Sequence, residues 1–140
     1  MENKYSDDVR QHLSFIQGVI NRMNSNSFSM KGWMVAIVSA LLAVYAANTD
    51  SSNSYIFFIA AIVGDIIFCF LDAYYLKVEK QYRDLYDKVR KSLIDTDFNM
   101  DAREFPRTLR EAMTSNSVWI LYTAVFFLLV IGLVLVFALS

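Results

Sequence analysis

The sequence contains only one cysteine, one histidine and one proline, and each scarcity excludes a class of site. Cys69 alone forms neither a disulfide framework nor a paired-cysteine metal site. His12 alone leaves no partner for a histidine-based triad or a histidine-rich metal site. The four glycines form no phosphate-binding loop. We therefore expect no enzyme activity, no bound metal and no cofactor.

Charged residues are absent from long stretches of the chain, although they make up 19% of it. None lies between Gly32 and Thr49 and none follows Glu111, whereas residues 77–111 are densely charged. A soluble domain spreads charge over its whole surface, so this segregation indicates a membrane protein. The net charge of -1 provides no basic field for binding nucleic acid.

Three apolar segments have a length that fits a bilayer, which requires about 20 residues for a spanning helix. We place these spans at residues 28–48, 55–76 and 118–139. The last one (VWILYTAVFFLLVIGLVLVFAL) has no polar face to show to water, which argues against a soluble bundle. The sequence therefore predicts an all-α integral membrane protein with three transmembrane helices, in contact with the lipid bilayer.

Lysine and arginine are distributed unevenly among the segments that join the spans. They occur in residues 1–31 and in residues 77–110, and they are absent from residues 48–54 and from the C-terminal end. Connectors rich in lysine and arginine stay in the cytoplasm. We therefore predict a cytoplasmic N-terminus, a cytoplasmic long connector, and a C-terminus on the outer side.

Residues 1–27 are predicted to form a cytoplasmic amphipathic helix followed by an elbow. The apolar stripe of this helix has the spacing of a coiled-coil seam and consists of Val9, Leu13, Ile16 and Ile20. Such a stripe either packs against another helix or lies on the membrane surface, and its polar face is poor in lysine and arginine for the second role. His12 is interpreted as solvent-facing or partly packed. The run Asn24-Ser25-Asn26-Ser27 predicts the elbow.

The second span is predicted to continue as one cytoplasmic helix to about residue 93, because no proline and only Gly64 occurs within it. A second apolar stripe follows its extension and consists of Tyr75, Val78, Tyr82, Leu85 and Val89. Neither stripe is covered by its own helix, so each must meet a neighbour. The two stripes pair within one chain, or they join copies of the chain into the collar of a homo-oligomer.

Residues 94–117 are predicted to form a cytoplasmic loop and a short helix that begins after Pro106. The acidic residues of this loop lack the glycine and the terminal carboxylate of a calcium-binding loop, so we interpret it as a packed surface loop. Three cations in this region, Arg83, Lys88 and Arg103, are candidates for docking a cytoplasmic protein partner.

Asp65 lies near the middle of the second span, where a charged side chain costs about 2.5–3.5 kcal/mol. Cys69 and Asp72 follow on the same stripe of the helix, and this stripe should face protein or water rather than lipid. Three roles are open for this stripe. It lines a pore formed by several subunits, forms hydrogen bonds with polar side chains of adjacent spans, or forms a proton-coupled site. The candidate polar neighbours are Ser39, Tyr45 and Thr123, and Gly64 is expected to allow a close helix approach.

The layout of the chain resembles that of small bacterial membrane effectors of anti-phage defence systems. The resemblance covers residues from about 8 to 93 and includes the amphipathic helix, the elbow with Lys31-Gly32-Trp33, a tight hairpin and the exit helix KVEKQYRDLYDKVRKSL. The layout is similar to that of the two-span SLATT-type effectors found beside nucleotide-signalling systems. It differs from theirs by the third span. The resemblance implies an oligomeric effector that perturbs the bacterial inner membrane when an infection signal arrives.

Two functions from different classes follow from these observations. The leading hypothesis is a homo-oligomeric inner-membrane protein that acts as a regulated pore, with Asp65 and Asp72 of several copies arranged around an axis. The alternative is a non-conducting membrane anchor that docks a cytoplasmic partner through its helical collar. Subunit number and activating signal are not encoded in any pattern that we find.

Overall fold

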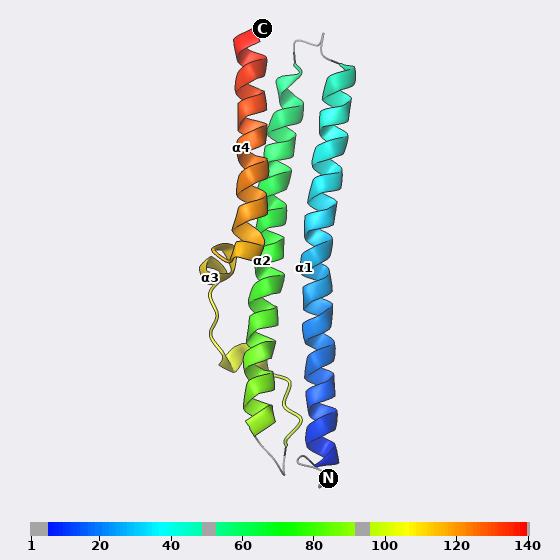
Figure 1. Cartoon of the computed structure of the whole chain (residues 1–140), viewed down its shortest axis with the longest axis vertical. Coiled ribbons are helices and arrows are strands. Elements are labelled where there is room, and N and C mark those ends of the chain that lie inside the picture. The colour runs from blue at the N-terminus through cyan, green and yellow to red at the C-terminus, as the bar shows by residue number, and fades with distance from the viewer. Residues whose placement is uncertain (1–5, 49–52, 92–95, 140) are drawn as a thin grey trace.

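The computed structural model describes residues 6–48, 53–91 and 96–139, and these residues form helices and connecting turns without a strand. Two long antiparallel helices, α1 (Asp7–Ala47) and α2 (Tyr55–Lys91), lie side by side, and α4 (Asn116–Leu139) packs along the first half of α2 (Figure 1). A 3-10 turn η1 (Ala102–Glu104) and the short helix α3 (Leu109–Met113) lie in the connector between α2 and α4. Helix α2 is therefore the element against which the others pack.

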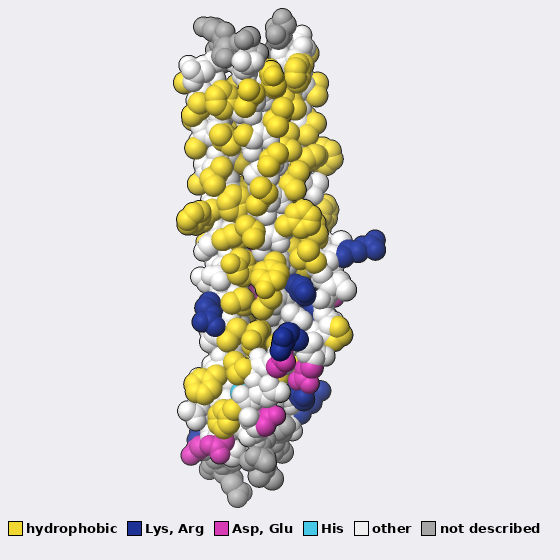
Figure 2. All heavy atoms as spheres, turned by 180° about the vertical axis from the view of Figure 1, so that it is seen from behind, with side chains coloured by type: hydrophobic (Ala, Val, Ile, Leu, Met, Phe, Trp, Pro, Cys, Tyr) yellow, Lys and Arg dark blue, Asp and Glu magenta, His cyan; other side chains and the backbone are white. Residues whose placement is uncertain are grey.

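The molecule divides along its length into an apolar half and a polar half. The apolar half comprises residues 33–48, 53–76 and 114–139, and the polar half comprises residues 6–32, 77–91 and 96–113. On the face shown in Figure 2, hydrophobic side chains cover the apolar half, and the charged side chains gather on the polar half. Helices α1, α2 and α4 each contain a stretch long and apolar enough to cross a membrane. This confirms an all-helical protein with three candidate spans.

Helix α1 passes through residues 24–27 without a break, so the predicted elbow there is wrong. The helix begins at Asp7 because the Ser6 side chain accepts a hydrogen bond from the Val9 amide, as an N-cap should. Asparagine and serine each lower helix stability by less than 1 kcal/mol. Packing of α1 on α2, in which Ser27 is buried, outweighs these small costs.

The two apolar stripes of the polar half pair with each other inside one chain. Val9, Ile16 and Ile20 of α1 are buried in one cluster with Leu85 and Val89 of α2, and Leu13 and Tyr82 pack against it. Tyr75 and Val78 are half-buried on the same helix. These side chains are thus covered, fully or in part, within the chain. Helix α2 is described to Lys91, and the predicted extension to residue 93 lies outside the described residues.

The loop after α2 lies against the polar half through specific hydrogen bonds. The Arg107 guanidinium donates two bonds to the Asp84 carboxylate, at 2.7 and 2.8 Å. Gln81 donates to the Phe105 carbonyl at 2.9 Å, and the Lys88 ammonium binds Glu104 at 2.8 Å. The helix predicted after Pro106 is α3, which begins at Leu109 because Thr108 caps it. Residues 94–95 of the predicted loop lie outside the described residues.

Helix α4 approaches α2 tightly at Gly132. A Cβ atom at this position would lie 2.4 Å from the Phe58 ring. Phe58 is itself buried and held edge-on against Tyr45, with ring centroids 4.8 Å apart. Nothing lies within 4 Å of a Cβ atom added at Gly64, so the expectation of a close contact there is wrong.

We predict that Gly132→Ala destabilises the protein by about 1–3 kcal/mol, because the added methyl group forces the Phe58 ring out of a packed position. The matched control is Gly64→Ala, which adds the same methyl group where space is free and raises helix propensity. Thermal unfolding of both variants in detergent, followed by circular dichroism, measures the difference. Equal unfolding temperatures for the two variants would contradict the packing described here.

A second prediction concerns the attachment of the loop to α2. Hydrogen bonds from Arg107 lower the pKa of Asp84 below its usual value. The stabilisation from this pair is therefore fully present above the unfolded-state pKa of about 4, and it is lost as pH falls through the lower folded-state pKa. We expect Arg107→Gln to destabilise the protein at pH 7, and this loss should shrink as the pH approaches 2. Denaturant unfolding as a function of pH measures it.

The control for this prediction is Asp84→Asn, which removes the titrating group and keeps the shape of the side chain. It should destabilise the protein at pH 7 and remove most of the pH dependence of the Arg107→Gln effect, because Arg107 then keeps only its exposed ion pair with Glu111. An Arg107→Gln effect that stays constant between pH 7 and pH 2 in the wild-type background would show that this pair does not hold the loop.

Candidate functional site

Asp72 lies at the boundary between the two halves and binds two side chains of α1. The Ser27 hydroxyl donates a hydrogen bond to Asp72 Oδ1. The Lys31 ammonium lies 2.5 Å from Asp72 Oδ2 and 3.1 Å from the Ser27 hydroxyl. Ser27 and Lys31 are four residues apart, which places them on one face of α1. The three side chains form a closed polar triangle between α1 and α2.

The carboxylate of this triangle is buried and its cation reaches the surface. The Asp72 side chain is 0% exposed, whereas the Lys31 side chain is 19% exposed. A buried charge is tolerated only when it is paired and hydrogen-bonded. The triangle meets this condition for Asp72, because one oxygen binds a hydroxyl group and the other binds an ammonium group.

The third long helix contributes Tyr122 to the same region. Tyr122 is buried beside Asp72, but its hydroxyl group forms no hydrogen bond with a described residue. Cys69 is half-buried and lies between Asp65 and Asp72 on the same stripe of α2. Side chains from α1, α2 and α4 therefore meet in one buried polar cluster, which consists of Ser27, Lys31, Asp65, Cys69, Asp72 and Tyr122.

Asp65 occupies the deeper end of this cluster, two helical turns or about 10 Å from Asp72 along α2. It is 2% exposed, and no hydrogen-bond donor among the described residues lies within reach of its Oδ1 atom. The nearest described cation that acts in this region, Lys31, is bound to Asp72. An ionised carboxylate at this position would therefore lack a partner, which is costly in an apolar environment.

The structure places the predicted intramembrane residues together but encloses them within one chain. Asp65 and Asp72 are buried against helices of the same chain rather than open to a second copy. Ser27 and Lys31 bind Asp72, whereas no hydrogen bond among the described residues joins Asp65 to Ser39, Tyr45 or Thr123, the neighbours expected for it. The Ser27–Lys31 spacing was the available sequence signal. It was missed because residues 24–27 were interpreted as an elbow.

A second group of side chains lies at the far end of the polar half. His12 is almost fully buried, and not solvent-facing or partly packed as expected. Its Nδ1 atom lies 2.5 Å from the Thr96 hydroxyl and its Nε2 atom lies 3.0 Å from the Asn99 carbonyl. The carbonyl can only accept, so Nε2 is the donor and Nδ1 accepts from Thr96 in the neutral ring. His12 thus ties the loop to α1.

Phe98 is displayed on the surface by this arrangement. Its φ angle of 53° is in the left-handed region, which is uncommon for a bulky residue. The Phe98 ring lies 5.5 Å from the His12 ring and 6.5 Å from the Phe15 ring. Phe15 is 51% exposed and Phe98 is 38% exposed. We call these two residues the aromatic pair.

The three candidate docking cations form ion pairs within the chain. Arg83 lies 2.6 Å from Glu79 on α2 and Lys88 lies 2.8 Å from Glu104 on η1. Arg103 binds Asp101 at 2.9 Å, and this contact lowers the pKa of Asp101 to about 2. All three cations are exposed, so their charges remain accessible at the surface.

The described residues contain no group of three histidine, cysteine, aspartate or glutamate side chains placed to hold a metal ion. No protein-family model, curated protein or solved structure matches this chain. Two features of the fold itself therefore indicate what the chain does. These are the buried polar cluster between the three helices and the exposed aromatic pair at the end of the polar half.

We predict that Lys31→Met destabilises the protein by about 3 kcal/mol, because it leaves the buried Asp72 carboxylate without its cation. Asp72→Asn should cost less than half as much, since the partly exposed Lys31 side chain can turn to water and asparagine still accepts from Ser27. The double variant should be more stable than Lys31→Met alone. Denaturant unfolding in detergent measures all three.

The control is Arg22→Met, which removes an exposed cation of the same helix that forms no ion pair with a described residue. It should change stability by less than about 0.5 kcal/mol. Strictly additive effects of Lys31→Met and Asp72→Asn would exclude the coupling between these two side chains.

Proposed function

We propose that this protein is a non-conducting membrane anchor whose polar half stands in the cytoplasm and binds a soluble protein. The orientation is supported by the charge distribution, because every described lysine and arginine lies in the polar half. A bacterial inner membrane is the membrane that the layout favours. The proposal therefore takes the second of the two functions derived from the sequence.

The observation that carries this proposal is the enclosure of the polar and apolar stripes within one chain. Asp65 and Asp72 would have to face an open path to line a pore, and they are buried between helices. The seams would have to be exposed to join copies, and they form the core of the polar half. A closed hairpin of this kind is suited to present a fixed surface rather than to assemble a channel.

A regulated pore and an effector role in anti-phage defence remain predictions from the sequence and its resemblance. A pore lined by Asp65 and Asp72 would require α1 and α4 to move away from α2. This movement would break the Lys31–Asp72 ion pair and its hydrogen bond to Ser27. The anchor requires no such rearrangement, and homo-oligomerisation through the lipid-facing surfaces is compatible with it.

The aromatic pair is the surface that we expect to contact the partner. Exposed aromatic side chains are enriched at the energetic centres of protein interfaces. The strained backbone of Phe98 persists because His12 holds the neighbouring Thr96 and Asn99 in place. A surface that is held in one conformation before binding loses less entropy when the partner binds. Phe15 and Phe98 are therefore preorganised for docking.

The proposal predicts that reconstituted protein carries no ion flux. Liposomes containing the wild-type chain should release an entrapped ion at the rate of protein-free liposomes, and Asp65→Asn should behave in the same way. A flux in the wild type that Asp65→Asn abolishes would overturn the proposal and establish the pore.

The docking surface is tested in cells by placing a photo-cross-linking phenylalanine analogue at Phe15. We expect a defined cross-link to a soluble protein, and this cross-link should be lost when His12→Ala releases the loop that carries Phe98. The matched control carries the same analogue at Phe127, an exposed position of α4 in the apolar half. Cross-links only between copies of the chain would support the oligomeric collar instead.

A further inference from the structure

Most acidic side chains of the polar half form ion pairs with nearby cations. A defined set of cations is left without an ion pair to a described residue. The ion pairs join Asp7 to Arg10, Glu79 to Arg83, Asp84 and Glu111 to Arg107, Asp87 to Arg90, Asp101 to Arg103, and Glu104 to Lys88. The remaining cations form no ion pair with any residue that the structure describes, and they are Arg22, Lys77, Lys80, Lys91 and Arg110.

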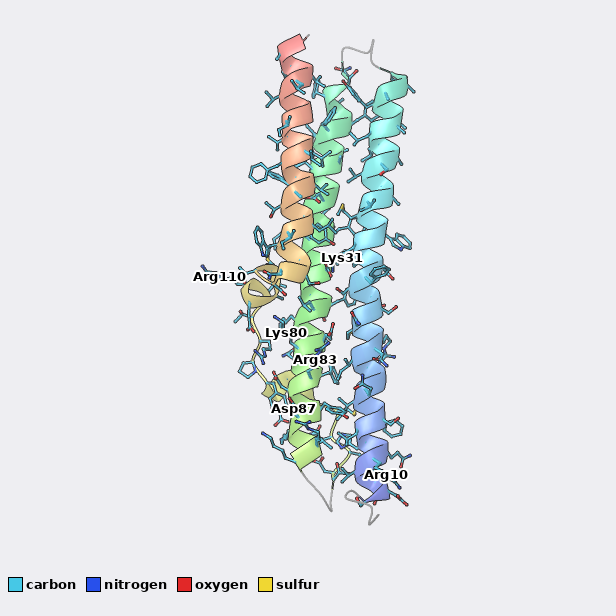
Figure 3. The ribbon with its side chains drawn as sticks, in the orientation of Figure 1. Arg10, Lys31, Lys80, Arg83, Asp87 and Arg110 are labelled. Atoms are coloured by element: carbon cyan, nitrogen blue, oxygen red, sulfur yellow. The ribbon has the colours of Figure 1, made fainter. Side chains whose placement is uncertain are left out.

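Four of these cations lie close to the boundary between the two halves. Lys77 and Lys80 follow Asp72 on α2 by about 8 and 12 Å along the helix axis. Arg22 lies at a similar level, because it precedes Lys31 by nine residues on the antiparallel helix α1. Figure 3 shows Arg110 projecting from α3 near the level of Lys31. We call Arg22, Lys77, Lys80 and Arg110 the cationic belt.

Exposed aromatic residues mark the same boundary on all three long helices. Trp33 of α1, Tyr74 of α2 and Trp119 of α4 are each largely exposed. Tryptophan and tyrosine are enriched at the level where the hydrocarbon core meets the lipid headgroups. The headgroup region adds about 5–8 Å on each side of a bilayer core. The cationic belt therefore lies on the headgroup side of these aromatic rings.

We propose that the cationic belt binds the phosphate groups of anionic phospholipids. Lysine and arginine side chains offer donors to phosphate oxygens, and at the membrane surface each contributes about fivefold to the attraction of anionic lipid. Lys77 also lines a shallow groove with Tyr74 and Tyr82, and this groove further includes Arg103 and its ion-pair partner Asp101. This inference rests on the proposed function in one respect, which is that the bound lipids lie in the cytoplasmic leaflet.

Lys91 provides an internal comparison within the same helix. It also lacks an ion pair with a described residue, but it follows Lys77 by 14 residues, or about 21 Å along α2. This distance exceeds the Debye length of about 10 Å at 0.1 M salt. Lys91 is therefore too far from the headgroups to contribute.

The two tryptophans of the chain, Trp33 and Trp119, are natural reporters of the surrounding lipid because both are exposed at the boundary. The full chain is reconstituted into phosphatidylcholine vesicles containing a minor fraction of brominated lipid, which quenches tryptophan fluorescence on contact. Brominated phosphatidylglycerol should quench more strongly than brominated phosphatidylcholine, with a relative association constant of about five, which is the contribution of the single cation that one headgroup contacts. Salt at about 1 M should remove the difference, because it shortens the Debye length to about 3 Å.

The variant that tests the assignment is Lys77→Gln with Lys80→Gln and Arg110→Gln, which leaves Arg22 as the only cation of the belt and should lower the relative association constant from about five to below about two. Lys91→Gln should leave it unchanged. If the triple variant does not fold, two measurements still test the proposal. The charge-preserving variant Lys77→Arg with Lys80→Arg should keep the preference for phosphatidylglycerol. The salt titration of the wild type should remove this preference.

Several outcomes would overturn this inference. These are equal quenching of the wild type by the two brominated lipids, a loss in Lys91→Gln as large as in the triple variant, or a preference that persists at high salt. Abolition of the preference by millimolar inorganic phosphate would show that the belt binds free phosphate rather than lipid. Failure to find a soluble partner would not change the quenching result, so this inference and the proposed function fail separately.

Discussion

The structure depends on the requirement that the buried carboxylate of Asp72 be neutralised within the chain. Lys31 and Ser27 meet this requirement from one face of α1, and they can do so only at one axial position of α1 against α2. That position sets the register of the entire antiparallel pair. It brings Val9, Ile16 and Ile20 opposite Leu85 and Val89 at the far end of the polar half, although this cluster lies well away from Asp72.

Helix α2 has different neighbours along its two halves, and this difference separates the functions of the halves. In the apolar half, α4 packs on it through the Gly132–Phe58 contact. In the polar half, the loop and α3 take the place of α4, and they are attached by side-chain hydrogen bonds rather than by apolar packing. The loop is therefore the part of the fold most sensitive to pH and to substitutions of single polar residues.

The spans and both apolar stripes were predictable because they depend on periodicity within one helix. The partners of Asp72 were not, because they depend on the relative register of two helices, which no single helix encodes. The same reason explains the two glycines: Gly64 and Gly132 look alike in sequence, and only the position of Phe58 distinguishes them. The predicted elbow was wrong because asparagine and serine disfavour a helix only weakly, and tertiary packing outweighs this preference. The burial of His12 by the loop carried no sequence signal.

The enclosure of Asp72 also limits how an effector function would have to operate. An open arrangement that separates Lys31 from Asp72 loses this ion pair and the helix packing around it, so the closed arrangement is favoured by a free energy that a signal would have to supply. A ligand would have to bind the open arrangement more tightly by the same free energy to populate it. The polar half, with its aromatic pair, is the part of the chain placed to receive such a ligand. In the proposed function, docking of a soluble protein at the polar half is therefore the first step, and the same step would precede any effector action.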